Sequence, residues 1–203
     1  MQIHKYRYLF NVIAILALML ATSCQSPFQN DSKEVAVTTD EPGIDSQSYV
    51  DAHLGWRNLW FTINPDELGL DLDPNTAIPF AVVMDIGQED GVVVSLASSI
   101  IGDGSIVSST GNRIFGGVEY ENVRNASKRF VEISADFVDE MELTTEYPLP
   151  SADNIKFYVI TPNGIYTAKE ATWDDLGSGV HELSPLFYAG NDVLTALRKA
   201  FGL

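Results

Sequence analysis

The chain has 203 residues, of which 28 are Asp or Glu and 12 are Lys or Arg, so its formal net charge is −16 at pH 7. A charge of this sign repels phosphate groups, and we therefore expect no nucleic acid partner. The length after residue 46 is that of one ordinary domain, which can bury a core without disulfides or metals.

The first residues have the pattern of a signal peptide. Lys5 and Arg7 lie in a start that contains no acid, and a run of thirteen mostly apolar residues follows at 9–21. A helix that crosses a bilayer needs about 20 apolar residues, so this run is short for one. It predicts the hydrophobic region of a signal peptide, with an uncleaved anchor or a plain secretory signal as the alternatives.

The end of this run and the residues after it, Leu20-Ala21-Thr22-Ser23-Cys24, resemble the lipobox of bacterial lipoproteins. In that motif a large aliphatic residue and then small residues precede a cysteine. The fit is good but slightly loose, because Leu20 lies four residues before the cysteine and Ala21 occupies the third position before it. The resemblance implies that residues 1–23 are removed and that Cys24 carries a diacylglycerol. Acylation of the new amine would add a further chain, and two or three chains hold a protein on a bilayer where one holds it only marginally.

The lipoprotein resemblance also implies a location in the cell envelope. Gln25, which is not aspartate, implies the outer membrane of a Gram-negative bacterium under the enteric sorting rule. Cys24 is the only cysteine, so no disulfide can form within the chain. Removal of the signal peptide would leave 10 basic against 28 acidic residues.

Residues 24–46 form a polar segment with two prolines and no apolar periodicity. This composition predicts a disordered tether between the lipidated cysteine and the domain, with an extended strand at 35–37 as the alternative. Residues 47–203 are then expected to form a single globular domain.

The first half of this domain predicts one helix and then three strands. Apolar residues at three- and four-residue spacing predict a helix at 49–61, although Gly55 weakens it. Short apolar runs separated by glycine-containing turns predict strands, and these lie at 80–84, 92–96 and 105–108.

The second half predicts a long helix, a hairpin and a closing helix. An amphipathic stripe predicts the long helix at 119–141. Strands are expected at 157–161 and 165–168, around a Pro-Asn-Gly turn, and Ser184-Pro185 predicts the start of the last helix. The fold class is therefore α+β, a single antiparallel sheet of about five strands with three packed helices, in the order α-β-β-β-α-β-β-α.

This order of elements is similar to that of roadblock-like and profilin-like small domains, an analogy of fold that implies no function. Several phrases also resemble an uncharacterised family of bacterial proteins. They are MDIG at 84–87, the glycine-rich turn before VR..SKRF at 123–130, FY.IT.NGIY at 157–166 and SPLF at 184–187. No activity is implied by that resemblance.

No motif of a metal or cofactor site is present, so we expect neither. His53 and His181 are the histidines outside the predicted signal peptide, and they belong to no HExxH motif or Cys/His cluster. Asp71-Leu72-Asp73-Pro74-Asn75 imitates the start of a calcium loop, but Thr76 replaces the turning glycine and Val82 the bidentate glutamate. An exposed acidic loop is the better interpretation.

The chain contains no G-x-S-x-G elbow and no SxxK motif. His181 lies in a Gly- and Ser-containing segment, and a hydrolase that uses His181 with a serine nucleophile remains an alternative function. His53 stands beside Trp56 and Trp60 on the predicted first helix, so we expect a packed or surface residue there and not a general base.

One glycine-rich segment is a candidate ligand site. It contains Gly111, Asn112, Arg113, Gly116 and Gly117, and it runs into a predicted helix start. Backbone N–H groups at a helix start, with Arg113, could hold an anion, although a tight turn explains the glycines equally. The most economical function is a binding or scaffold module, anchored to the bilayer by the acyl chains on Cys24 and holding an envelope protein or a small ligand.

Overall fold

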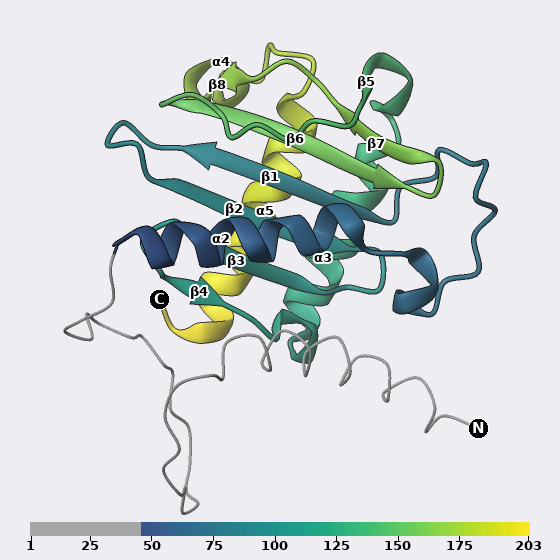
Figure 1. The fold of residues 1–203 in the computed structure, drawn as a ribbon, viewed down its shortest axis with the longest axis horizontal. Helices are drawn as coiled ribbons and strands as arrows, with labels where there is room; N and C mark the ends of the chain where they lie inside the picture. Colours follow the sequence, from purple (N-terminus) through teal and green to yellow (C-terminus); the bar gives the residue numbers. More distant parts are fainter. Residues whose placement is uncertain (1–45) are drawn as a thin grey trace, which may run out of the picture.

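The computed structural model describes residues 46–203, and they form one antiparallel eight-stranded sheet with helices on both faces (Figure 1). The predicted α+β class and the single antiparallel sheet are confirmed. The predicted numbers of about five strands and three helices are only roughly matched, because these residues contain eight strands and four α-helices. The predicted signal peptide, Cys24 and residues 24–45 of the predicted tether lie outside the described residues.

The chain passes through its elements in a simple order. It contains, in sequence, α2 (Ser46–Thr62), the 3₁₀ turn η1 (Pro65–Leu68), β1 (Ala81–Gly87), β2 (Val93–Ser99), β3 (Gly104–Ser108), β4 (Arg113–Ile114), η2 (Gly117–Glu119), α3 (Glu121–Ser134), η3 (Val138–Glu140), β5 (Glu142–Thr144), β6 (Asn154–Thr161), β7 (Gly164–Thr167), β8 (Ala171–Thr172), α4 (Trp173–Gly177) and α5 (Ser184–Phe201).

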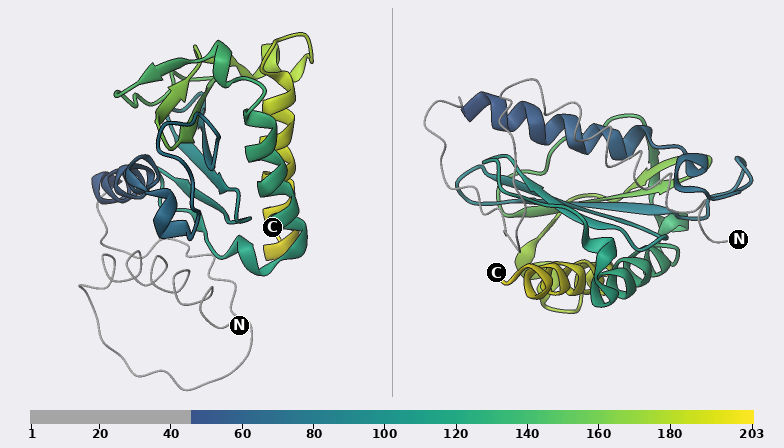
Figure 2. Two further views of the ribbon diagram at one scale, coloured as in Figure 1. Left: turned by 90° about the vertical axis from the view of Figure 1, so that its right-hand side faces the viewer. Right: turned by 90° about the horizontal axis from the view of Figure 1, so that it is seen from below.

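The central strand of the sheet is β1. The strand order is β4-β3-β2-β1-β6-β7-β5, and β8 pairs with the start of β6. Every residue of β1 is buried, because α2 covers one face of the sheet and α3 and α5 cover the other (Figure 2). A strand that is covered on both faces is expected to be apolar throughout, and Asp85 is the exception in β1.

Alternation along the strands divides the interior into two cores. In β1, Val82 and Met84 point to the core beneath α3 and α5, whereas Ala81 and Val83 point to the core beneath α2. Asp85 continues the second series. It therefore projects a carboxylate toward α2, into a core whose apolar members are Trp, Phe, Tyr and aliphatic side chains.

The elements that the sequence analysis missed are the shortest ones. Strands β4, β5 and β8 have two or three residues and α4 has five, which is too few for a periodicity to show. The long helix predicted at 119–141 ends at Ser134. Its apolar stripe continues because Val138 and Met141, in and after η3, are buried in the same core as α3.

Gly55 lies on the exposed side of α2, and a Cβ atom added there would have no neighbour within 4 Å. Alanine is favoured over glycine inside helices by about 0.5–1 kcal/mol, so we expect Gly55→Ala to raise the free energy of unfolding by about that amount. Urea denaturation measures it.

Gly190→Ala is the matched control in α5. A Cβ atom there would lie 2.7 Å from the buried Met84 Sδ, so displacement of that side chain opposes the same propensity gain. Equal stabilisation by the two substitutions would contradict this account of the α5 contact.

Candidate functional site

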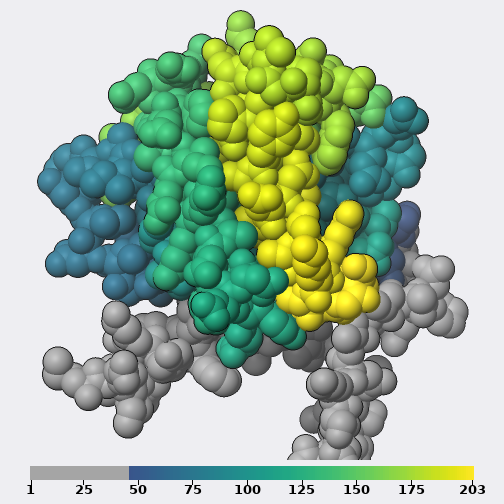
Figure 3. Space-filling model, turned by 180° about the vertical axis from the view of Figure 1, so that it is seen from behind, coloured from purple at the N-terminus to yellow at the C-terminus, as the bar shows by residue number. Residues whose placement is uncertain are grey.

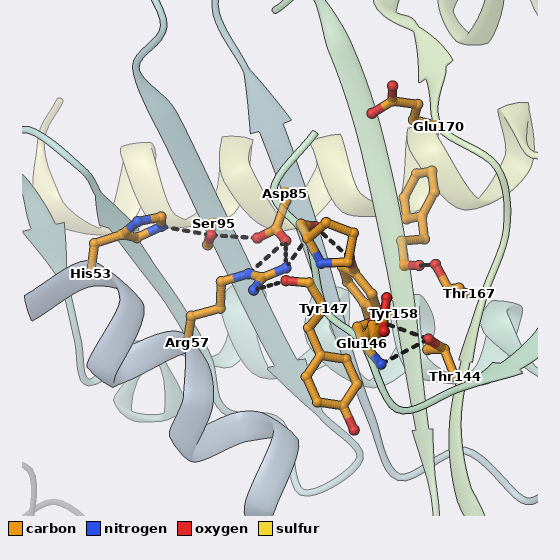
Figure 4. A network of polar contacts seen from close by, with 12 residues as sticks. His53, Arg57, Asp85, Ser95, Thr144, Glu146, Tyr147, Tyr158, Thr167 and Glu170 are labelled. Atoms are coloured by element: carbon orange, nitrogen blue, oxygen red, sulfur yellow. Dashed lines mark hydrogen bonds and ion pairs between the residues drawn. The ribbon is translucent and has the colours of Figure 1, made fainter. Parts of the chain in front are cut away.

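The most concentrated polar group of the domain lies between α2 and the sheet (Figure 4). His53 and Arg57, one helical turn apart on α2, face Asp85 of β1 and Ser95 of β2. Asp85 and Ser95 are direct partners in the β1–β2 register, so their side chains lie next to each other on one face. None of the four residues is more than 2% exposed. We call this set the α2 network.

Arg57 and Asp85 form the ion pair at its centre. Arg57 Nε donates to Asp85 Oδ2 over 2.7 Å, and Arg57 Nη2 lies 2.6 Å from the same oxygen. Isolated buried charges are very costly, so a buried pair persists only if its remaining hydrogen-bonding groups are also satisfied. The outer side of the guanidinium must therefore find acceptors elsewhere.

These acceptors come from residues 145–150, a segment between β5 and β6 that we call the strap. Arg57 Nη1 donates to the carbonyl of Tyr147 over 2.7 Å, and Nη2 donates to the carbonyl of Pro148 over 3.3 Å. The guanidinium carbon lies 4.7 Å from the ring centroid of Phe61 and 5.1 Å from that of Tyr158. Arg57 is thus enclosed by acceptors and by aromatic faces, which stabilise its charge.

The strap is itself held in place from two sides. The Tyr158 hydroxyl donates to the carbonyl of Pro148 over 2.5 Å, and burial raises the pKa of Tyr158 to about 12, so this donor keeps its proton. The rings of Phe61 and Tyr147 stack with centroids 4.2 Å apart. The strap therefore closes over Arg57 as a fixed part of the core.

Hydrogen bonding fixes the tautomer of His53. The Ser95 hydroxyl donates to Asp85 Oδ1, so its oxygen must accept the hydrogen of His53 Nε2, which is 2.8 Å away. Nδ1 has no partner among the described residues, and on a neutral ring it is a buried acceptor. Burial lowers the pKa of His53 below its ordinary 6.5; Asp85 opposes this shift and Arg57 adds to it.

The α2 network contains the residue types of a serine hydrolase but not their arrangement. In a catalytic triad the acid holds the histidine, and the histidine removes the serine proton. Here the serine gives its hydrogen to the acid, and the histidine gives its own to the serine. All three side chains are also 0% exposed. The network joins a helix to a sheet and presents no reactive group to solvent.

His181 is half-buried in the turn before α5, and both of its hydrogen bonds stay within that turn. Its Nδ1 accepts from the backbone N–H of Leu183 over 3.1 Å, and its carbonyl accepts from Ser184 N over 2.9 Å. Within residues 46–203, no serine hydroxyl is hydrogen-bonded to the ring. The structure therefore does not bring together the histidine and serine of the predicted alternative site.

The glycines of the predicted anion site have local structural roles. Gly111 and Gly116 adopt left-handed φ angles of +93° and +82°, which suit glycine. A Cβ atom on Gly111 would collide with the ring of Tyr49, and one on Gly117 would collide with the carbonyl oxygen of Gly104. Turn geometry and close packing account for all three positions.

The polar members of that segment do not converge. Arg113 lies exposed on the edge strand β4, and the Asn112 carbonyl accepts from Ser108 N over 2.8 Å in the β3–β4 turn. The helix that follows starts at Glu121, after η2, so Glu119 and Glu121 stand where the anion was expected. Carboxylates at this position oppose an anion, and ligand binding there stays a prediction.

The described residues contain no group of three or more His, Cys, Asp or Glu side chains placed to hold a metal ion. In the loop after η1, Asp73 Oδ1 accepts from the backbone and side-chain nitrogens of Asn75 in an exposed turn. No helix within 46–203 is long and apolar enough to cross a membrane.

His53, for which a packed or surface position was expected, is packed, but its partners could not be predicted. Arg57 and Asp85 are 28 residues apart, and Arg57 and Tyr147 are 90 apart, so no local spacing reveals the α2 network. The one available signal was Asp85 itself, an acid inside a strand that is otherwise apolar. No protein-family model matches the chain, and no match was found among curated proteins or solved structures.

Removal of one charge of the ion pair is expected to lower the free energy of unfolding strongly. Asp85→Ala leaves the Arg57 guanidinium buried without its carboxylate, and we expect a loss of about 3–5 kcal/mol in the free energy of unfolding. The double variant Arg57→Met/Asp85→Leu removes both charges and is expected to regain most of that loss. Urea denaturation measures both. An Asp85→Ala variant as stable as the exposed control Asp71→Ala would refute the role given to the pair.

The lowered pKa of His53 predicts that the free energy of unfolding decreases in mild acid. Its pKa is lowered by folding, so the unfolded chain binds more protons below pH 6.5 and unfolding becomes easier as the pH falls. The slope approaches about 1.4 kcal/mol per pH unit until the pKa of the folded state is reached. His53→Gln, which keeps a donor for Ser95, is expected to abolish this slope.

The carboxyl of Asp103 has the opposite effect on the pH dependence of stability, so the His53 variants are compared without it. Burial raises the pKa of this carboxyl to about 6, so it favours the folded state as the pH falls from 6 toward 3.8. The His53 comparison is therefore made in an Asp103→Asn background, with urea denaturation between pH 7.5 and 5. Equal slopes with and without the His53→Gln substitution would show that the imidazole is not held neutral by burial.

Proposed function

We propose that the chain is an exported bacterial lipoprotein whose folded part is a binding or scaffold module. Residues 1–23 are its signal peptide, and acyl chains on Cys24 hold it on a bilayer. The basic start, the short apolar run and the lipobox-like residues support this assignment. Gln25 favours the outer membrane of a Gram-negative bacterium.

The observation that carries the choice of binding over catalysis is the closure of the α2 network. In residues 46–203 it is the one network in which side chains of serine, histidine and an acid are hydrogen-bonded to one another, and none of its members is more than 2% exposed. A catalytic group must reach the substrate that it transforms. Residues that are sealed in a core and paired with one another contribute to the fold and leave recognition to the surface.

The alternative function, an envelope hydrolase that uses His181 with a serine, is less well supported. A neutral imidazole has one lone pair for proton abstraction, and on His181 that lone pair accepts the Leu183 N–H. The ring would have to break this contact before it could act as a base. Loss of ester, peptide or glycan hydrolysis on His181→Ala would favour the alternative.

A crosslinked pull-down from native membranes tests the proposal. The full-length tagged protein is compared with Cys24→Ser, which lacks the thiol that lipidation requires. We expect the protein to be recovered in the membrane fraction with one stoichiometric envelope partner, and the variant to lose both. Equal membrane recovery of the two forms would refute the anchor, and recovery of the anchored form without a partner would refute a stable protein complex.

A further inference from the structure

One end of the domain exposes a group of apolar side chains. Trp173 at the start of α4 is 45% exposed, Val180 in the following loop is 89% exposed, and Tyr188 in the second turn of α5 is 45% exposed. Figure 3 shows these segments, coloured lime to yellow-green, at the end of the molecule opposite the yellow C-terminal residues. We call the three side chains the Trp173 patch.

The Trp173 patch is held in place by the residues beneath it. The ring of Trp173 meets the buried Phe187 edge to face, with centroids 5.0 Å apart. The Tyr188 hydroxyl donates to the carbonyl of Gly177 over 2.8 Å, and the Thr172 hydroxyl accepts from Asp175 N at the start of α4. A partner would thus meet a surface that is already ordered, which lowers the entropic cost of binding.

The border of the patch is acidic. Asp174, Asp175 and Glu182 are all exposed beside it, and the chain has no Lys or Arg from Glu170 to Leu197. Scattered apolar residues on a surface need no explanation, but neighbouring Trp, Val and Tyr side chains with a polar border are typical of interaction sites. The negative charge of this border disfavours binding to anionic lipid headgroups and favours cationic partners.

We infer that the Trp173 patch is the docking surface for a cationic polypeptide segment, in which Lys or Arg residues flank an apolar anchor. The anchor contacts Val180 and Tyr188, an Arg or Lys lies over the Trp173 ring, and the other cations face Asp174 and Glu182. This inference rests on the proposed function as a binding module and names its partner class.

The three tryptophans allow the charge of the patch to be measured directly. Trp56 and Trp60 are 6% and 8% exposed, so Trp173 dominates quenching by ions in solution. We expect caesium to quench Trp173 more strongly than iodide when each is normalised to its quenching of free N-acetyltryptophanamide, and Asp174→Lys/Glu182→Lys to reverse that order. Neither side chain makes a hydrogen bond that holds the fold, unlike Asp175. Stronger normalised quenching by iodide in the unchanged protein would overturn the cationic partner.

Site-specific photocrosslinking tests the contact itself. The full-length anchored protein carries a photoreactive amino acid at Val180, or at Leu143 of β5 as a control that is 62% exposed elsewhere. We expect one adduct through position 180, on a segment of net positive charge, and none through 143. Asp174→Lys/Glu182→Lys should reduce its yield about tenfold, whereas Asp66→Lys/Asp71→Lys, with the same change in charge in and after η1, should not.

The outcomes separate this inference from the proposed function. An adduct with lipid or with an acidic segment, or no adduct at 180, overturns the Trp173 patch as the docking surface. If the pull-down still returns a stoichiometric partner, the proposed function stands and the partner binds elsewhere. If neither experiment returns a partner, the docking surface and the stable protein complex are both refuted, whereas the lipid anchor is judged by membrane recovery of Cys24→Ser alone.

Discussion

The fold depends on the buried ion pair between Arg57 and Asp85. The pair joins a helix at the start of the domain to the central strand of the sheet, and its remaining donors reach the strap between β5 and β6. Three segments that are far apart in the sequence are thereby brought to one point. Since a lone charge there would be very costly, each segment is needed by the others, and α2 cannot leave the sheet without exposing or stranding a charge.

The α2 network also restricts how α2 can lie. Apolar contacts between Trp56, Trp60 and the sheet would tolerate small rotations or shifts of the helix, since hydrophobic attraction has no direction. Hydrogen bonds from His53 to Ser95 and from Arg57 to Asp85 do not tolerate them, because two side chains one turn apart must meet two cross-strand partners together. The polar groups thus fix a register that the apolar groups leave open.

The parts of the fold that local patterns determine could be predicted, and those that depend on distant contacts could not. Alternation, turn residues and helical periodicity located α2, the central strands and α5, because each has enough residues to show its pattern. Strands β4, β5 and β8 exist because a neighbour pairs with them, and the end of α3 at Ser134 is hidden by apolar residues that continue into η3. Likewise, the sequence favoured a packed or surface position for His53 over a catalytic one, but it could not show the hydrogen bond to Ser95 or the neighbouring pair of Arg57 and Asp85.

The distribution of polar groups determines where function can reside. In the interior, charge and hydrogen bonding are almost fully used, with His53 Nδ1 and the Ser184 hydroxyl as the buried side-chain atoms without a partner in the described part of the chain. At the surface, excess acid gives solubility and repels anions, but charge alone does not select one partner from many cations. Selection requires shape and apolar contact in a fixed place. The end of the domain around α4 combines these properties, because an ordered indole and phenol stand beside exposed carboxylates on a support that binding need not reorganise.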